Sequence, residues 1–338
     1  MIDNNNCFNI KKLKNIVLLG QSQCFSKLQE INKKLNLKDI IVTCSHQKKL
    51  FSREKNVHVF DDLSNKFKNF VKKKFDLTDT LFVSIGCRWI FKKSDLNNFF
   101  CDNLVNFHGT RLPYDAGGGG FSWKILRNDR INNFIVHLIE PGIDKGRILM
   151  NEKSLFPSSC KIPRDFEEHY YNNLPYFYEK FLKKILGSEK IIPKIQVDYI
   201  GRYNPRLNTS ISGWIDWKMP SEDLSKFINA FDDPYLGAST MINGKVVRLK
   251  DVHLHGGDTP NHNFMSGIIS RHDKDWLVVS TIDKNMLIVE KINDLKGNNI
   301  IKKLKNGERF YTPSSKLDLA FSKKIGYNSK GLILKNIK

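Results

Sequence analysis

Short apolar runs alternate with polar segments of helical spacing over the first two-thirds of the chain. The apolar runs are residues 15–20, 39–44, 57–60, 80–86 and 103–108, and the helical segments between them include 22–35 and 62–74. Strands separated by helices of this length predict βαβ units and a mainly parallel sheet. Two more strands, 132–139 and 147–156, flank the turn 140–146, and a long amphipathic helix is expected over 164–186.

The pattern changes after about residue 205. One helix is predicted at 221–231, with Ser221 as its N-cap and Asp223 in its first turn. Short apolar runs separated by turns follow, at 244–254, 267–273, 276–283 and 285–292, and they are typical of a small β-barrel or sandwich. We therefore expect two domains, 1–204 of α/β type and 205–338 of β-rich type with a basic tail, with the boundary near Asn204.

Composition excludes several protein classes. Hydrophobic residues make up 40% and charged residues 27% of the 338 positions, and the mean hydropathy is −0.40. This balance is unlike that of a disordered chain, and no apolar run approaches the roughly 20 residues that span a bilayer. The first residues lack an apolar core followed by a cleavage site, so a cytoplasmic location is expected. The six cysteines are scattered without a CxxC pair, which gives little support to a zinc or disulfide framework.

The chain is strongly basic, with 55 Lys and Arg against 35 Asp and Glu and a net charge of +20. Such a field attracts nucleic acid, membrane headgroups, or phosphorylated and polyglutamylated small molecules. However, the lysines are spread along the whole chain and form no single basic block. The charge alone therefore does not choose a function.

The segment 103–148 carries the candidate chemistry. Asn106 and His108 stand two apart at the end of a predicted strand, so their side chains project from one face, at the sheet edge where α/β proteins bind ligands. The four glycines 117–120 can bring backbone amides close to a ligand because no Cβ intervenes. Asp144 lies in the tight turn PGIDKG. Each feature also has a purely structural explanation, and only their joint order is informative.

That joint order resembles the formyltransferase family that uses N10-formyltetrahydrofolate, which includes methionyl-tRNA, glycinamide ribonucleotide and sugar N-formyltransferases. The family pattern reads here as NFHGT, Leu112-Pro113, GGGG, Trp123 and IDKGRI, and the resemblance continues through YNPRL, GWIDW and FDDPYLGA to cover about 80–310. It implies a Rossmann-like domain with a mainly parallel sheet, followed by a small OB-like domain. Two segments depart from the pattern: AGGGG replaces the Arg-Gly-x-x-Pro loop of tRNA-acting members, and 84–91 matches only in position and apolar character.

The resemblance also implies roles for individual residues. Asn106 would donate a hydrogen bond to the oxyanion, His108 would act as general base, and Asp144 would orient the imidazole and hold its charge. The cosubstrate N10-formyltetrahydrofolate would contact Ile85, Gly86, Cys87, Arg88, Trp89, Ile90 and Asp144. The acceptor would contact Thr110, Gly117, Gly118, Gly119, Trp123 and Arg206, with phosphates held by Arg88, Arg111 or Arg206. No metal is required, and the histidines in HLHGGDTPNH lack Cys or carboxylate company at ligand spacing.

Three acceptors or functions remain open from the sequence. The glycine loop leaves room for a nucleotide-linked amino sugar destined for O-antigen or another surface polysaccharide, with dTDP-4-amino-4,6-dideoxyglucose preferred and GDP-perosamine or a 3-amino sugar as alternatives. The positive charge and the C-terminal β domain favour methionyl-tRNA instead. A non-catalytic basic RNA-binding protein on the same scaffold is the third, although all three catalytic residues are present. We expect neither a nucleic-acid nor a membrane partner, and a homodimer through the C-terminal half.

Overall fold

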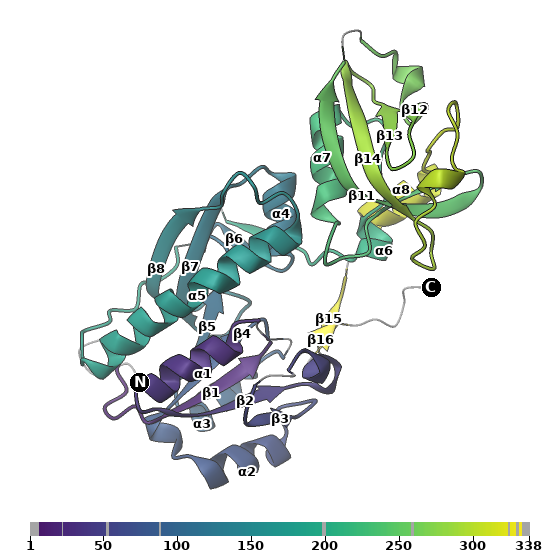
Figure 1. Cartoon of the computed structure of the whole chain (residues 1–338). Coiled ribbons are helices and arrows are strands. Elements are labelled where there is room, and N and C mark those ends of the chain that lie inside the picture. Colours follow the sequence, from purple (N-terminus) through teal and green to yellow (C-terminus); the bar gives the residue numbers. More distant parts are fainter. Residues whose placement is uncertain are drawn as a thin grey trace.

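A seven-stranded sheet forms the centre of the N-terminal body (Figure 1). The computed structural model describes residues 7–21, 23–51, 54–87, 89–197, 201–257, 260–323, 325–328 and 331–332. The sheet has the order β3 (Val57–Val59), β2 (Lys38–Thr43), β1 (Asn15–Gly20), β4 (Thr80–Ile85), β5 (Leu104–His108), β7 (Ile131–Leu138) and β8 (Ile148–Leu155). The first five strands are parallel, and β7 is antiparallel to both of its neighbours, β5 and β8. The predicted mainly parallel sheet is confirmed.

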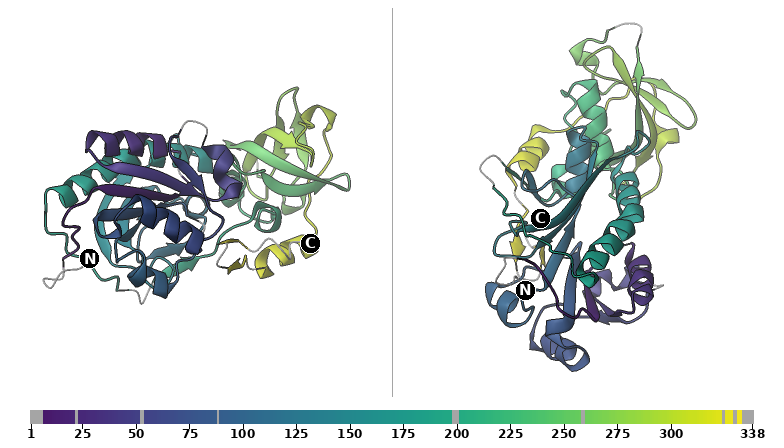
Figure 2. Two further views of the ribbon diagram at one scale, coloured as in Figure 1. Left: turned by 90° about the horizontal axis from the view of Figure 1, so that it is seen from below. Right: turned by 90° about the vertical axis from the view of Figure 1, so that its left-hand side faces the viewer.

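Helices cover both faces of this sheet (Figure 2). All six residues of β1 are buried, with Ile16 and Leu18 in one core and Val17 and Leu19 in the other. Because successive strand residues point to opposite faces, a continuously apolar strand needs cover on both sides. One core contains residues of α1 (Phe25–Lys34) and α5 (Pro163–Leu186), and the other contains residues of α2 (Asn65–Lys74) and α3 (Lys93–Asn98).

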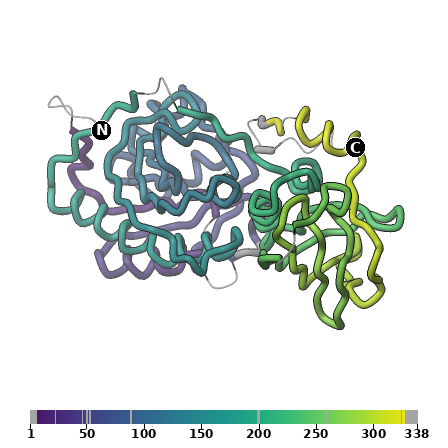
Figure 3. Tube along the Cα trace, turned by 90° about the horizontal axis from the view of Figure 1, so that it is seen from above, coloured from purple at the N-terminus to yellow at the C-terminus, as the bar shows by residue number. Residues whose placement is uncertain are grey.

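The C-terminal body is an antiparallel sheet beside the first body (Figure 3). Its strand order is β10 (Ala238–Ile242), β11 (Lys245–Gly256), β14 (Asn285–Asn293), β13 (Leu277–Ser280) and β12 (Ile269–His272). Its helices are α6 (Thr209–Ser212), α7 (Ser221–Ala230) and α8 (Ser314–Ser322). Shorter elements of the chain are η1 (Ser45–Leu50), η2 (Leu77–Asp79), η3 (Asn263–Met265), η4 (Ile301–Lys303), β15 (Tyr327–Asn328) and β16 (Gly331–Leu332). The predicted β-rich second part is confirmed.

The start of α7 corrects one prediction. Ser221 is the first helical residue rather than the N-cap, because Pro220 occupies the cap position. The backbone N–H of Ser221 donates instead to the carboxylate of Asp283 at 2.9 Å, and the Ser221 hydroxyl accepts a hydrogen bond from Asn285. A side chain 62 residues away therefore caps the helix, which local sequence rules cannot anticipate.

The glycine run is more ordered than the sequence suggested. A short strand, β6 (Asp115–Gly117), pairs in parallel with β9 (Arg202–Asn204), and α4 (Gly120–Leu126) begins at the last of the four glycines. The indole of Trp123 in α4 donates to the Pro205 carbonyl at 2.9 Å. The loop after β5 is thereby tied to the segment that leads into the C-terminal body.

Among the residues that the structure describes, no helix is both long and apolar enough to cross a lipid bilayer.

Candidate functional site

The three residues predicted to carry the chemistry come together at one end of the sheet. Asn106 and His108 lie at the carboxyl end of β5, and Asp144 lies in the turn between β7 and β8. Asp144 Oδ2 is 3.8 Å from His108 Nε2, and the two side chains are only 14% and 16% exposed. This is the sheet edge at which parallel strands present ligand-binding groups. The arrangement can hold an imidazole next to a carboxylate and an amide donor.

The turn that carries Asp144 is held in an uncommon shape. Asp144 has φ +55°, a region that non-glycine residues rarely occupy. The backbone N–H of Gly117 donates to its Oδ2 at 2.9 Å, and the Gln196 amide donates to the carbonyls of Asp144 and Gly146, at 2.8 and 2.6 Å. A Cβ on Gly146 would lie 1.7 Å from the Leu138 carbonyl oxygen, so only glycine fits there. The position of the carboxylate is therefore determined by the fold.

The contacts of His108 indicate its tautomer. The Thr110 hydroxyl is hydrogen-bonded both to His108 Nε2 and, at 2.6 Å, to the Asp115 carbonyl oxygen. A carbonyl only accepts, so the single hydroxyl proton goes to Asp115 and the Nε2–H of His108 donates to Thr110. Nδ1 is then the nitrogen with a lone pair.

The sequence reasoning missed His137, which lies directly opposite Asn106 on β7. Its side chain is 2% exposed, and its Nδ1 contacts the Leu138 carbonyl oxygen at 2.7 Å and so must carry a proton. Its Nε2 therefore accepts from the Asn106 amide nitrogen, at 3.1 Å. This contact fixes the Asn106 amide with its NH₂ group toward the site, and one of its two N–H groups remains available.

His137 should make stability depend on pH. Burial lowers its pKa to about 4, so the folded chain keeps it neutral while the unfolded chain takes up a proton near pH 6.5. Its contribution to the free energy of unfolding is thus full above pH 6.5 and is lost as the pH falls toward 4. We expect His137→Gln to flatten this part of the stability profile in urea unfolding between pH 7 and 4.5. The exposed His253 provides a matched control as His253→Gln, and equal slopes for the wild type and His137→Gln would contradict the assignment.

The residues predicted to bind folate fall into two groups. Ile85 and Trp89 are buried in the two cores, and the Trp89 indole donates to the Asp61 carbonyl. Gly86 and Ile90 are exposed and Cys87 is partly exposed at the end of β4. Arg88 lies outside the described residues. Of the predicted folate residues that the structure describes, Gly86, Cys87 and Ile90 therefore reach the surface, and Ile85 and Trp89 do not.

The residues predicted to bind the acceptor line the segment from β5 to α4. Thr110 and Gly117 make the contacts to His108 and Asp144 described above, and Gly118 N–H donates to the Asn204 carbonyl. Gly119 has φ +69° and caps α4. Arg206 is partly buried and its charge acts on Glu167 of α5, whose pKa burial raises to about 7. Thr110 and Gly117 thus hold candidate catalytic side chains, and Gly118 ties the loop to β9.

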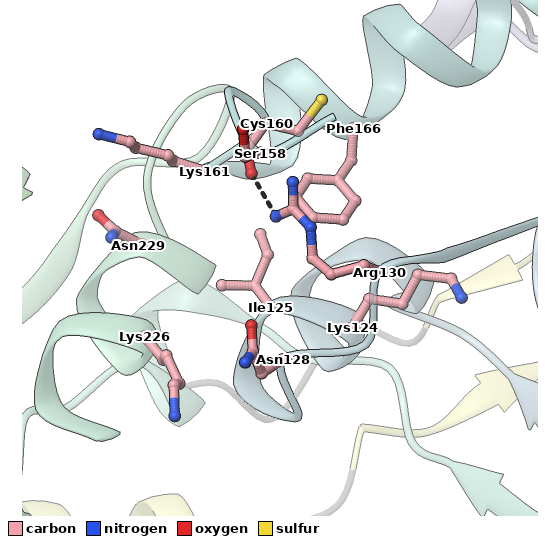
Figure 4. Close-up of a pocket in the computed structure, with 10 residues that line it drawn as sticks. All are labelled: Lys124, Ile125, Asn128, Arg130, Ser158, Cys160, Lys161, Phe166, Lys226 and Asn229. Carbon is pink, nitrogen blue, oxygen red and sulfur yellow. Dashed lines mark hydrogen bonds between the residues drawn. The ribbon is translucent and has the colours of Figure 1, made fainter. Parts of the chain in front are cut away.

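Two cavities lie near this region. One of about 240 Å³ opens beside Asp144 and is lined by Pro113, Ala116, Asp144, Lys145 and Gln196. The other, of about 130 Å³, lies between α4, α7 and the loop after β8 (Figure 4). Two of its cations are engaged in hydrogen bonds, because Arg130 donates to the Cys160 carbonyl and Lys124 donates to Asp129 and the Ile131 carbonyl. Within the described ranges, no group of three or more His, Cys, Asp or Glu could hold a metal ion. Of these two cavities, the one beside Asp144 is lined by a candidate catalytic residue.

Several solved structures superpose on this chain. An N-formyltransferase from Helicobacter canadensis, in complex with folinic acid and dTDP-3-aminofucose, superposes with a TM-score of 0.61 at 18% identity, over 82% of this chain and 99% of that one. The chain has the formyltransferase fold. Residues 209–307 match the family described as formyl transferase, C-terminal domain.

Other formyltransferases match as well. A sugar N-formyltransferase from a Shewanella species superposes with a TM-score of 0.57 at 15% identity, over 70% of this chain and 97% of that one. In sequence, the methionyl-tRNA formyltransferase of Clostridium perfringens is 24% identical over 198 residues, which are 59% of this chain. The aligned part spans 60% of the length of that relative. The formyltransferase fold is therefore common to relatives that are named for different acceptors.

Proposed function

We propose that the chain transfers a formyl group from N10-formyltetrahydrofolate to the amine of a nucleotide-linked amino-deoxy sugar. The observation that carries the proposal is the convergence of Asn106, His108 and Asp144 on one sheet edge within the formyltransferase fold. Asp144 also lines the cavity of about 240 Å³, which offers space for a ligand beside it. Its 240 Å³ is below the usual size of a complete ligand pocket, so it would take only part of the folate.

The chemistry follows from the contacts of these side chains. The neutral amine attacks the formyl carbon, and the resulting oxyanion accepts the free N–H of Asn106, whose orientation His137 fixes. His108 takes the amine proton on Nδ1, and the nearby Asp144 carboxylate stabilises the imidazolium. Collapse of the intermediate breaks the bond to the folate nitrogen, which receives the proton. One N–C bond forms, one breaks, and the proton passes between the two nitrogens.

Two observations support a sugar acceptor. The loop AGGGG lacks the Arg and Pro of the tRNA-acting pattern, and the Helicobacter neighbour was solved with dTDP-3-aminofucose. We take dTDP-4-amino-4,6-dideoxyglucose as the specific acceptor, with dTDP-3-aminofucose as the competing sugar and surface polysaccharide as the destination of the product. The second candidate is methionyl-tRNA formyltransferase, favoured by the names of the sequence relatives and by the net charge of +20.

Salt dependence separates these acceptors. A protein that makes 6–10 contacts to duplex phosphates loses about 10³–10⁵ in affinity between 50 and 200 mM salt, whereas a nucleoside diphosphate offers two phosphates and should lose about tenfold or less. The assay measures formyl transfer from N10-formyltetrahydrofolate to either sugar nucleotide or to charged initiator tRNA, at both salt levels. We expect turnover with a sugar nucleotide and a shallow dependence on salt. Turnover with the tRNA alone, lost as salt rises, would overturn the proposal in favour of the second candidate.

A further inference from the structure

Three arginines surround one buried carboxylate beside the candidate site. Asp115 on β6 is 2% exposed, and its Oδ1 is 3.1 Å from Arg202 Nε and 3.3 Å from an Nη of Arg127. Arg111 Nε is 3.9 Å from the other carboxylate oxygen. One buried carboxylate thus faces three guanidinium groups, which always carry a proton. The neighbouring Lys124–Asp129 ion pair adds one charge of each sign, so the surplus is two positive charges. We call Asp115, Arg111, Arg127 and Arg202 the arginine cluster.

Part of this surplus is open to a ligand. The Arg111 Nε is buried without a hydrogen-bond partner, although an unpaired buried donor is costly. The Arg111 and Arg202 side chains are 35% and 57% exposed, so both reach the surface. Arg127 differs, because it is 24% exposed and also donates to the Asn204 side chain at 2.9 Å. Asp115 and Arg127 therefore act as the support, and Arg111 and Arg202 are the groups that an anion could approach.

The cluster is two hydrogen bonds from the candidate catalytic base. The Asp115 carbonyl accepts from Thr110, which is hydrogen-bonded to His108, and two residues later Gly117 donates to Asp144. Along β6, Asp115 and Ala116 point to opposite faces. Ala116 lines the cavity beside Asp144, whereas Asp115 pairs with Arg202 in register on the other face. One face of β6 therefore lines the cavity beside Asp144, and the opposite face carries the arginine cluster.

We propose that Arg111 and Arg202 bind the diphosphate of the acceptor while the folate approaches through the cavity on the opposite face of β6. This inference rests on the proposed function and names its substrate class, an acceptor with two adjacent phosphates. In a nucleotide-linked amino sugar, the sugar ring holds the diphosphate and the reacting amine apart. The phosphate site should therefore lie near the candidate general base, His108, without overlapping it. Guanidinium groups suit phosphates because they donate paired, charge-assisted hydrogen bonds.

The test measures binding apart from turnover. Inorganic pyrophosphate and dTDP are titrated calorimetrically into the full chain, with folinic acid as a separate titrant. We expect Arg111→Gln and Arg202→Gln each to weaken pyrophosphate and dTDP affinity about tenfold or more, because each removes charge-assisted hydrogen bonds, and to leave folinic acid affinity unchanged. The control Arg271→Gln removes an exposed arginine that lies over Trp276 in the C-terminal body, and it should change none of the three affinities.

The outcomes separate this inference from the proposed function. Unchanged pyrophosphate and dTDP affinity in both variants, or no measurable binding by the wild type, would overturn the anion site and leave the cluster as a support for β6. Displacement of bound dTDP by an RNA acceptor-stem helix, with a steep loss in salt, would assign the surface to RNA and overturn the diphosphate. If the variants lose dTDP affinity as expected but no amino sugar is formylated, the anion site stands and the proposed function fails.

Discussion

Replacing His108 by alanine should lower kcat for formyl transfer by about 10²–10⁴, the usual contribution of a general base. The reason is geometric. Asp144 Oδ2 lies 3.8 Å from His108 Nε2, and the Nε2–H donates to the Thr110 hydroxyl, which leaves Nδ1 to receive the proton of the amine. Because the proposed role of the ring is to take the amine proton and not to bind the rest of the acceptor, dTDP and folinic acid affinities should change little. Steady-state kinetics would measure the loss of kcat, and calorimetric titration with dTDP and with folinic acid would measure the two affinities.

A control variant and a double variant test whether the loss of kcat comes from the general-base role of His108. His255→Ala removes an exposed histidine of β11 and should leave kcat unchanged. Combining His108→Ala with Asp144→Asn should cost little more than His108→Ala alone, because residues that act as a unit give non-additive effects. A His108→Ala variant that retains more than a tenth of the wild-type kcat would exclude the general-base role.

Replacing Lys250 by methionine should remove about 3–5 kcal/mol from the free energy of unfolding, the usual cost of breaking a buried ion pair. Lys250 Nζ lies 3.3 Å from the Asp232 carboxylate, and the two side chains are 6% and 0% exposed. The ammonium also contacts Asp233 and the Tyr235 carbonyl. Without it, Asp232 keeps backbone donors such as the N–H of Asp251 but loses its buried counter-charge. Urea unfolding at pH 7 would measure the loss.

The loss of stability in Lys250→Met should also depend on pH. Burial raises the pKa of Asp232, so the fold favours its protonated form. The stability contributed by this raised pKa is present in full below the pKa of an aspartate in the unfolded chain, near 3.9. It is lost as the pH rises through the pKa of Asp232 in the folded chain. The deficit of Lys250→Met should therefore shrink as the pH is lowered toward 4. Adding Asp232→Asn should recover part of the loss at pH 7, and a deficit that is the same at every pH would contradict the explanation.

Local rules sufficed for much of the sheet and for the candidate catalytic groups. A strand buried on both faces reads as a continuous apolar run, which is why β1 and β4 were predicted from sequence alone. Asn106 and His108 share a face because strand side chains alternate, and this holds whatever the neighbouring strand is. Their approach to Asp144 was expected from the resemblance and not from spacing, since 36 or more residues separate it from them.

Features that depend on pairing register could not be predicted in this way. His137 sits in an apolar strand with nothing local to distinguish it, and only its register with Asn106 makes it part of the site. Asp115 was likewise hidden, because the arginines around it come from three separate segments of the chain. The signal in the sequence was weak but present: a buried histidine or aspartate in an apolar context needs a partner, and the search for that partner starts with its possible cross-strand neighbours.

The pairing of β6 with β9 bears on where this protein could be recombined with its relatives. The Asn204 side chain accepts a hydrogen bond from Arg127, and its backbone carbonyl accepts one from the N–H of Gly118. The carbonyl of the next residue, Pro205, accepts a hydrogen bond from the Trp123 indole. A chimera joined after Asn204, at the change in sequence pattern, would keep β9 but replace Pro205, whose carbonyl accepts the hydrogen bond of the Trp123 indole. A crossover placed after Leu207 would retain β9, Pro205 and the arginine cluster and would exchange residues 209–307 as a unit, so the candidate catalytic groups would keep their native neighbours.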